Sequence, residues 1–162
     1  MTRVVILMGS GVDEAHARVI ADAVTAYGVD VITRVGSAHK TPEHVIGLVR
    51  GYDQPGTVFV TIAGRSNALS AFVDACVSAP VIACPPLSGA YAAEDLWSSV
   101  RLPSGVASMT VLEPANAALA AVKILGLADV GLRERIAAHQ AAERAKVVDA
   151  DAALSTNSGE HG

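Results

Sequence analysis

The sequence predicts a three-layer α/β protein in which helices cover both faces of a doubly wound parallel sheet. Over the first 127 residues, short apolar runs alternate with longer segments of helical periodicity, the pattern of strands linked by crossover helices. The chain is 51% hydrophobic but only 4% aromatic, so Val, Ile, Leu and Ala must fill the core, as in strands buried on both faces. Because crossovers are right-handed, few topologies remain, and we expect the flavodoxin-like or Rossmann-like strand order 2-1-3-4-5.

Five strands are expected where short apolar runs stop at glycine, proline or polar residues. They span residues 3–8, 29–35, 57–63, 79–84 and 106–112. The first three are rich in valine, isoleucine and threonine, the residues that strands favour.

Five helices are expected to follow these strands. They span residues 13–27, 41–50, 66–77, 94–100 and 114–127. Gly28 is a C-cap candidate for the first helix, and Thr41 and Pro42 suit the N-cap and first position of the second. Leu69 and Val73 fall on one face of the third helix, and the fifth is rich in alanine.

An extra helix is expected at the C-terminus, from residue 129 to about residue 154. Its large apolar side chains are few: Leu132, Ile136, Val147, Val148 and Leu154. Such a helix is hardly stable alone in water, so we expect it to lie on a neighbouring subunit. Residues 155–162 are polar and expected to be disordered, which leaves residues 1–154 as a single domain.

The composition excludes several classes of function. The net charge is −4 with no basic block, which argues against nucleic acid as a partner. No apolar run approaches the roughly 20 residues of a membrane span, and no signal peptide precedes the first strand, so a cytoplasmic protein is expected. Cys76 and Cys84 form no CxxC motif and are interpreted as reduced, mostly buried thiols, with no metal site.

Polar loops follow the first three strands, whose carboxyl ends lie side by side in the expected topology. Ligands of open parallel sheets bind at that edge. The first loop contains Gly9, Ser10, Gly11 and Asp13 and leads into a helix N-terminus, which suits a phosphate. Ser10 adds a hydroxyl donor, while Asp13 either accepts from ribose hydroxyls or simply caps the helix.

The second loop contains Ser37, Ala38, His39 and Lys40. Histidine exchanges protons near neutral pH, so His39 is the candidate proton donor or acceptor, unless it is only a solvated loop residue. Lys40 offers a cation for a phosphate or for negative charge that develops on a substrate.

The third loop contains Ala63, Gly64, Arg65, Ser66 and Asn67. Its glycine permits close approach, and its guanidinium, hydroxyl and amide suit a small anionic or carbonyl group. Alternatively, Ser66 caps the next helix and Arg65 forms a surface ion pair. The residues alone therefore predict a protein that binds a small phosphorylated ligand, with His39 transferring a proton.

Five segments, in this order along the chain, resemble the phosphoribosylaminoimidazole carboxylase family of purine biosynthesis. They are residues 6–10 (ILMGS), 37–42 (SAHKTP), 63–67 (AGRSN), 84–86 (CPP) and 97–105 (WSSVRLPSG). Together the segments are specific, and the resemblance covers about residues 3–127.

This family has a mutase branch and a direct carboxylase branch. Mutases typically show His-Arg in the second loop and Ala-Gly-Gly-Ala-Ala-His in the third, whereas this chain has His39-Lys40 and AGRSN. The chain thus resembles the direct carboxylase, found in animals and some bacteria. The family's first loop usually reads Gly-Ser-x-Ser-Asp, and Val12 here replaces the second serine, which removes one hydroxyl donor.

The resemblance implies a lyase that adds CO2 to C4 of 5-aminoimidazole ribonucleotide (AIR) to give 4-carboxy-AIR (CAIR), without cofactor or metal. It implies that His39 removes the C4 proton, and that Arg65, Ser66 and loop amides hold CO2 and the new carboxylate. Ser10 and Lys40 would bind the 5′-phosphate and Asp13 the ribose. The family forms compact homo-oligomers, so an octamer or tetramer is expected. The alternatives are the mutase and a non-catalytic nucleotide-binding module on the same fold.

Overall fold

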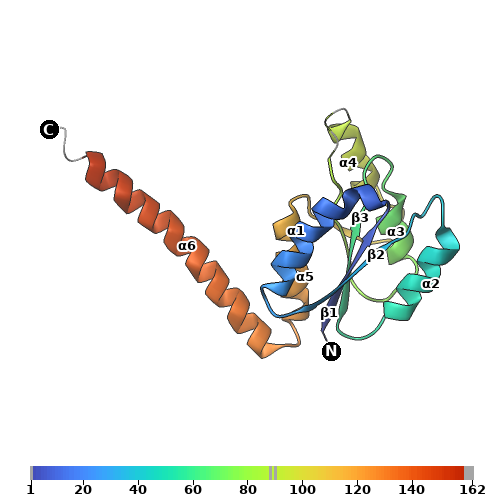
Figure 1. Ribbon diagram of the computed structural model, residues 1–162, viewed down its shortest axis with the longest axis horizontal. Coiled ribbons are helices and arrows are strands. Elements are labelled where there is room, and N and C mark those ends of the chain that lie inside the picture. The colour runs from blue at the N-terminus through green and yellow to red at the C-terminus, as the bar shows by residue number, and fades with distance from the viewer. Residues whose placement is uncertain (1, 88, 90, 159–162) are drawn as a thin grey trace.

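The computed structural model describes residues 2–87, 89 and 91–158. These residues contain a five-stranded parallel sheet of order β2-β1-β3-β4-β5, which confirms the predicted fold and topology (Figure 1). The strands are Arg3–Met8 (β1), Asp30–Val35 (β2), Thr57–Ile62 (β3), Val81–Ala83 (β4) and Met109–Thr110 (β5). The helices are Gly11–Asp13 (η1, a 3-10 turn), Glu14–Thr25 (α1), Pro42–Tyr52 (α2), Ala68–Asp74 (α3), Ala92–Val100 (α4), Pro114–Leu125 (α5) and Val130–Ser158 (α6).

The last two strands are shorter than predicted, for reasons that the backbone contacts explain. Two prolines follow Cys84 and lack an N–H for the ladder, so β4 ends there. Before β5, the amide of Ala107 donates to Asp74 Oδ2 of α3 at 2.8 Å instead of to a strand. The prediction of a strand over residues 106–112 was therefore wrong except at its centre, where β5 spans Met109–Thr110.

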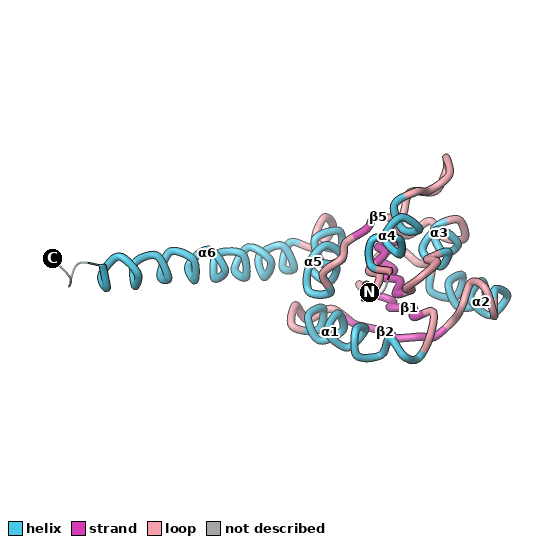
Figure 2. Tube along the Cα trace, turned by 90° about the horizontal axis from the view of Figure 1, so that it is seen from above, coloured by secondary structure: helices cyan, strands magenta, loops and turns pink. Residues whose placement is uncertain are grey.

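Helices cover the two faces of the sheet in separate layers. Along β1, alternate side chains face opposite layers, as the pleat of a strand requires. Val4 and Ile6 pack in one core with α1 and α5, whereas Val5 and Leu7 pack in a second core with α2 and α3 (Figures 1 and 2). Both cores consist almost wholly of aliphatic side chains, as the composition predicted.

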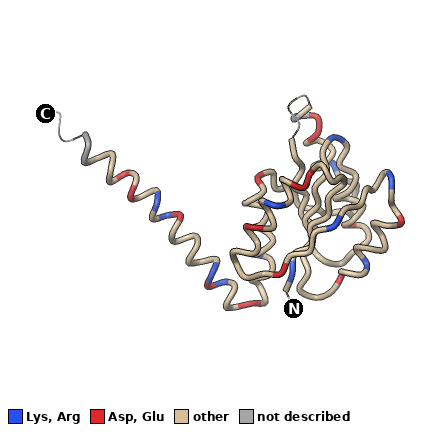
Figure 3. Tube along the Cα trace, in the orientation of Figure 1, with Lys and Arg blue, Asp and Glu red and all other residues tan. Residues whose placement is uncertain are grey.

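The extra helix exists, and its first turns are anchored through Leu132 and Ile136, which pack in the core beside α5. The rest of α6 projects from the body of the molecule and carries charges of both signs (Figures 2 and 3). Its helix extends to Ser158, so residues 155–158 are helical rather than disordered, and residues 159–162 lie outside the described part of the chain. Among the described residues, no helix is long and apolar enough to span a membrane.

The register of the central strands places three loops at one level. Met8 of β1 is paired with Val35 of β2 and with Ile62 of β3. The ladder continues one residue further, since Gly36 N donates to Met8 O and Gly9 N donates to Ile62 O, each at 2.8 Å. The loops after β1, β2 and β3 therefore leave the sheet side by side.

Gly36 is required where the second loop leaves the sheet. A Cβ there would lie 2.8 Å from Val45 Cγ2, and Val45 is fully buried and β-branched, so it has no rotamer freedom to yield. We expect Gly36→Ala to lower the free energy of unfolding by about 1–3 kcal/mol, measured by urea denaturation.

Gly47, inside α2, provides the matched control, since a Cβ there would meet nothing within 4 Å outside its own helix. Gly47→Ala should raise stability by up to about 1 kcal/mol through helix propensity. If the two substitutions changed the free energy of unfolding equally, the close contact with Val45 at Gly36 would not be what requires a glycine there.

Candidate active site

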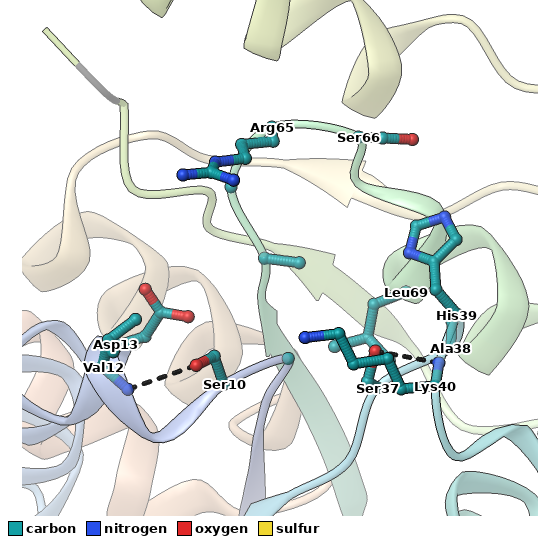
Figure 4. A pocket seen from close by; sticks show the side chains of 13 residues that line it. Ser10, Val12, Asp13, Ser37, Ala38, His39, Lys40, Arg65, Ser66 and Leu69 are labelled. Carbon is teal, nitrogen blue, oxygen red and sulfur yellow. Dashed lines mark hydrogen bonds between the residues drawn. The ribbon is translucent and has the colours of Figure 1, made fainter.

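The three loops enclose a cavity of about 490 Å³ at the carboxyl end of the sheet (Figure 4), a size typical of small-ligand pockets. Its lining consists of Gly9, Ser10, Val12, Asp13, Ser37, Ala38, His39, Lys40, Ala63, Gly64, Arg65, Ser66 and Leu69. Every predicted site residue lies there except Gly11 and Asn67. Val12 and Leu69 line the cavity although they were not predicted to bind, and apolar residue types gave no signal for that role.

In the first loop, Ser10 shapes the entry into the helix. Its Oγ accepts a hydrogen bond from the amide of Val12 at 3.4 Å and thereby caps the η1 turn. Its hydroxyl proton remains available for a ligand. The side chain of Val12 is 87% exposed, and Gly11 faces an adjacent hollow on α1 instead of the cavity.

Asp13 stands at the N-cap of α1 but makes no side-chain cap hydrogen bond. Its carboxylate points into the cavity instead (Figure 4), so the simple capping interpretation was wrong. Partial burial raises the pKa of Asp13 above its ordinary value, and the nearby His16 only partly opposes the rise. A desolvated carboxylate without a donor is favoured when a ligand supplies hydroxyl groups.

A closed turn holds the second loop, which carries His39 and Lys40. The amide of Thr41 donates to Ser37 O at 2.9 Å, and the amide of Ser37 donates to Thr41 Oγ1 at 3.0 Å. The amide of Lys40 also donates to Ser37 Oγ at 3.2 Å. Thr41 Oγ1 thus braces the loop and makes no cap bond to α2.

Figure 4 shows how the loop directs its side chains. His39 stands at one side of the cavity and Asp13 at the other, and the Lys40 ammonium extends between them towards Ser10. Both His39 and Lys40 are exposed to the open cavity. The arrangement leaves a proton-transfer group and a cation facing the same space.

The third loop carries a strained backbone. Arg65 has φ of 58°, and no other non-glycine residue in the described part of the chain has positive φ. This left-handed conformation costs a residue with a side chain about 1–2 kcal/mol. Arg65 forms no ion pair with any described residue, so the structure does not support the alternative in which Arg65 forms a surface ion pair. Such strain at a pocket is typical of functional positions.

Asn67 lies behind the cavity rather than in it. It is 1% exposed, and its side-chain oxygen accepts from the amide of Ser70 at 3.3 Å, which caps α3. The alternative in which Ser66 is the N-cap was therefore wrong, and α3 begins two residues later than expected. Asn67 Nδ2 donates to Ser99 Oγ of α4 at 2.9 Å.

The segment after β4 forms a wall of the third loop. A Cβ on Gly64 would lie 3.2 Å from the carbonyl oxygen of Pro86, so the glycine permits this close approach. Cys84, just before the prolines, is buried, and His16 Nε2 lies 3.3 Å from its sulfur. Burial, and then the negative charge of Glu113, raise the pKa of Cys84 to about 12, so this thiol stays protonated and does not act as a nucleophile.

The chemistry available in the cavity follows from its side chains. It combines two cations, one carboxylate, a histidine and three serine hydroxyls at the carboxyl end of a parallel sheet. Cations and hydroxyls suit a phosphate and a carboxylate. In the described residues, no three His, Cys, Asp or Glu side chains lie close enough to hold a metal ion.

Comparisons with known proteins agree with this arrangement. A model of the AIR carboxylase family matches residues 3–146. A phosphoribosylaminoimidazole carboxylase from Archaeoglobus fulgidus is 49% identical over 152 residues, which cover 94% of this chain and 84% of the relative. A human bifunctional phosphoribosylaminoimidazole carboxylase/succinocarboxamide synthetase is 43% identical over 78% of this chain, and the match spans 30% of that longer protein.

The fold comparison gives the same result. The crystal structure of Treponema denticola PurE superimposes with a TM-score of 0.92 at 42% identity, over 95% of this chain and 99% of that one. The matched region includes all three loops of the cavity and most of α6. The chain therefore belongs to the AIR carboxylase family.

Proposed function

We propose that this protein adds CO2 directly to C4 of AIR and releases it again in the reverse direction. AIR carboxylation in purine biosynthesis follows from the family, and the direct route is our proposal. The observation that carries it is the opening of His39, Lys40 and Arg65 into one cavity. Arg65 supports the direct carboxylase rather than the mutase, because the mutases of this family typically have a histidine in the third loop.

The reaction requires one proton acceptor at C4. The aminoimidazole ring is an electron-rich enamine, so C4 attacks the carbon of CO2, and one C–C bond forms while one C=O π bond opens to a carboxylate. C4 then carries both the carboxylate and its original hydrogen. His39 accepts that proton, and the C–H electrons restore the aromatic ring. Proton transfer of this kind contributes a factor of about 10²–10⁴.

The other loops bind and orient the nucleotide. Ser10 on the first loop and Lys40 on the second loop line the same side of the cavity, and their hydroxyl and ammonium groups suit the 5′-phosphate. The Asp13 carboxylate, which makes no cap hydrogen bond, accepts from ribose hydroxyls. Small lining residues are proposed to contact the substrate through their backbone and to let it approach closely. They are Gly9, Ser37, Ala38, Ala63 and Gly64. Gly11 and Asn67, which lie outside the cavity, act on the substrate only indirectly.

Arg65 and Ser66 suit CO2 and the carboxylate that it becomes. Negative charge develops on the CO2 oxygens as the new bond forms, and donors held in place beside those oxygens stabilise that charge. Because CO2 is small and held weakly, its positioning contributes much of the rate. Leu69 and Ala63 line the same cavity and help to exclude water.

The protein is also proposed to act as a homo-oligomer in the cytoplasm. Residues 141–155 of α6 are exposed throughout, including Val147, Val148 and Leu154, and a helix of such sequence needs a partner. Cys76 and Cys84 are free thiols, which suits a reducing compartment.

The direct route is tested by supplying two substrates to the purified protein without ATP. We expect saturable formation of CAIR from AIR and bicarbonate, followed by ultraviolet absorbance. Conversion of the N5-carboxyamino isomer of AIR, with no reaction of AIR and bicarbonate, would identify a mutase and contradict the proposal.

Arg65 should separate activity from stability. Arg65→Ala and Arg65→Gly both remove the guanidinium, and each is expected to lower kcat/KM for CO2 on the order of 10²-fold. The glycine variant should be more stable than the alanine variant by about 0.5–1 kcal/mol in thermal denaturation, because only alanine keeps the strained Cβ at φ of 58°. Full activity in either variant would contradict the proposed role of Arg65 in binding CO2 and the new carboxylate.

The solution mass tests the proposed assembly. Light scattering of the full chain should give four or eight times the 16.5 kDa of one chain. Truncation after residue 140 leaves Leu132 and Ile136 in place and is expected to lower the mass or weaken the assembly on dilution. A monomer at all concentrations would contradict the proposal.

A further inference from the structure

One face of α4 is tied to the third loop, although the two are 31 to 33 positions apart in the chain. The amide of Asn67 donates to Ser98 Oγ at 2.8 Å. The Ser98 hydroxyl in turn lies 3.0 Å from Arg65 O and 2.8 Å from Asp95 O. Because the hydroxyl has a single proton, it donates to one of these two carbonyls at a time. When it donates to Arg65 O, it ties the peptide of Arg65 directly to α4.

A second tie lies deeper, between Asn67 and Ser99. Asn67 Nδ2 donates to Ser99 Oγ at 2.9 Å, and both side chains are almost wholly buried. Thr110 Oγ1 of β5 donates to Ser99 O at 3.1 Å, so the contact is anchored to the sheet. A buried amide that is satisfied on both its oxygen and its nitrogen rigidifies its surroundings.

These ties surround the two loop residues that face the cavity. Arg65 has the strained left-handed backbone, and Ser66 lies between Arg65 and the anchored Asn67. Figure 4 shows that the Arg65 and Ser66 side chains point in different directions from this short arc. Such a conformation persists only where the surrounding structure holds it, and here the hydrogen bonds of α4 do so.

We infer that Ser98, with Asn67 and Ser99 behind it, is a positioning residue that sets the Arg65–Ser66 arc for the carboxyl group transferred in the reaction. This inference rests on the proposed function, because it needs CO2 to bind at that arc. Neither Ser98 nor Ser99 lines the cavity, so their effect passes through the loop. In the proposed function the nucleotide is held by the other two loops, whereas the hydrogen bonds that tie Ser98 and Ser99 to a loop of the cavity reach the third loop.

The kinetic consequence is selective for one of the two substrates. Loosening the third loop should weaken the handling of CO2 while the phosphate and ribose contacts stay intact. Ser98→Ala is expected to lower kcat/KM for CO2 by about tenfold, the size expected for losing one or two hydrogen bonds. The KM for AIR should not change.

Two variants serve as controls. Ser98→Thr keeps the hydroxyl, and threonine in a helix also bonds to the preceding turn, so it should restore most of the CO2 handling. Ser78→Ala removes a serine hydroxyl that bonds to Asp53 at 3.3 Å, in the loop before β4 at the other end of the sheet. Its kinetics should match those of the wild-type protein.

Amide hydrogen exchange provides a readout that does not depend on the reaction. In Ser98→Ala the amide of Asn67 loses its acceptor and should exchange at least about tenfold faster, while amides of β1 and β3 keep their protection. Thermal denaturation shows whether the variant remains folded at the assay temperature.

The outcomes separate the two proposals. If the wild-type protein carboxylates AIR and Ser98→Ala has unchanged kinetics for CO2, the positioning role alone would be overturned. Equal losses of kcat/KM for CO2 and for AIR in Ser98→Ala would overturn it as well. A wild-type protein that does not carboxylate AIR would contradict the proposed function, and the positioning role would fall with it, even if exchange showed that Ser98 orders the loop. A selective CO2 defect that Ser98→Thr rescues supports both.

Discussion

The in-register parallel pairing of β1 with β2 and β3 is the constraint on which the rest of the structure depends. Met8 is level with Val35 and Ile62, and the backbone bonds of Gly9 and Gly36 continue that alignment into the loops. A slip of one residue would turn the side chains of β1 to the opposite cores and separate the three loops. One ladder therefore both packs the aliphatic cores and assembles the cavity.

Rigid loops complete what the sheet begins. The second loop is closed by reciprocal hydrogen bonds between Ser37 and Thr41. The third is held from α4 with Arg65 in a left-handed conformation. Asp13, which is partly desolvated without a cap bond, and Arg65 are both arranged at some cost to stability. These costs lie around one cavity, where a bound substrate would offset them.

The sequence predicted the sheet order and the helix layers because aliphatic runs and helical periodicity are local patterns, and right-handed crossovers leave few topologies for strands and helices that alternate. It also predicted the three loops, since polar residues and glycines follow each strand. It did not identify Asn67 as the cap of α3, because the same residue type suits a ligand or a helix cap, and only the contacts with Ser70 and Ser99 show the cap. It failed for most of β5, where Asp74 competes for the backbone from a distant helix, and no local pattern encodes such a contact.

The central claim is that His39 moves a proton on and off C4 while CO2 is transferred. The most direct measurement is the decarboxylation of CAIR by the wild-type protein in heavy water, with the C4 position of the AIR product followed by proton NMR. The account predicts that the wild-type protein releases CO2 and places one deuterium at C4, both faster than in an enzyme-free control. It also predicts that a folded His39→Asn variant, which still binds the nucleotide, loses both activities. Undiminished turnover in that variant, or isomerisation of CAIR without release of CO2, would contradict the account.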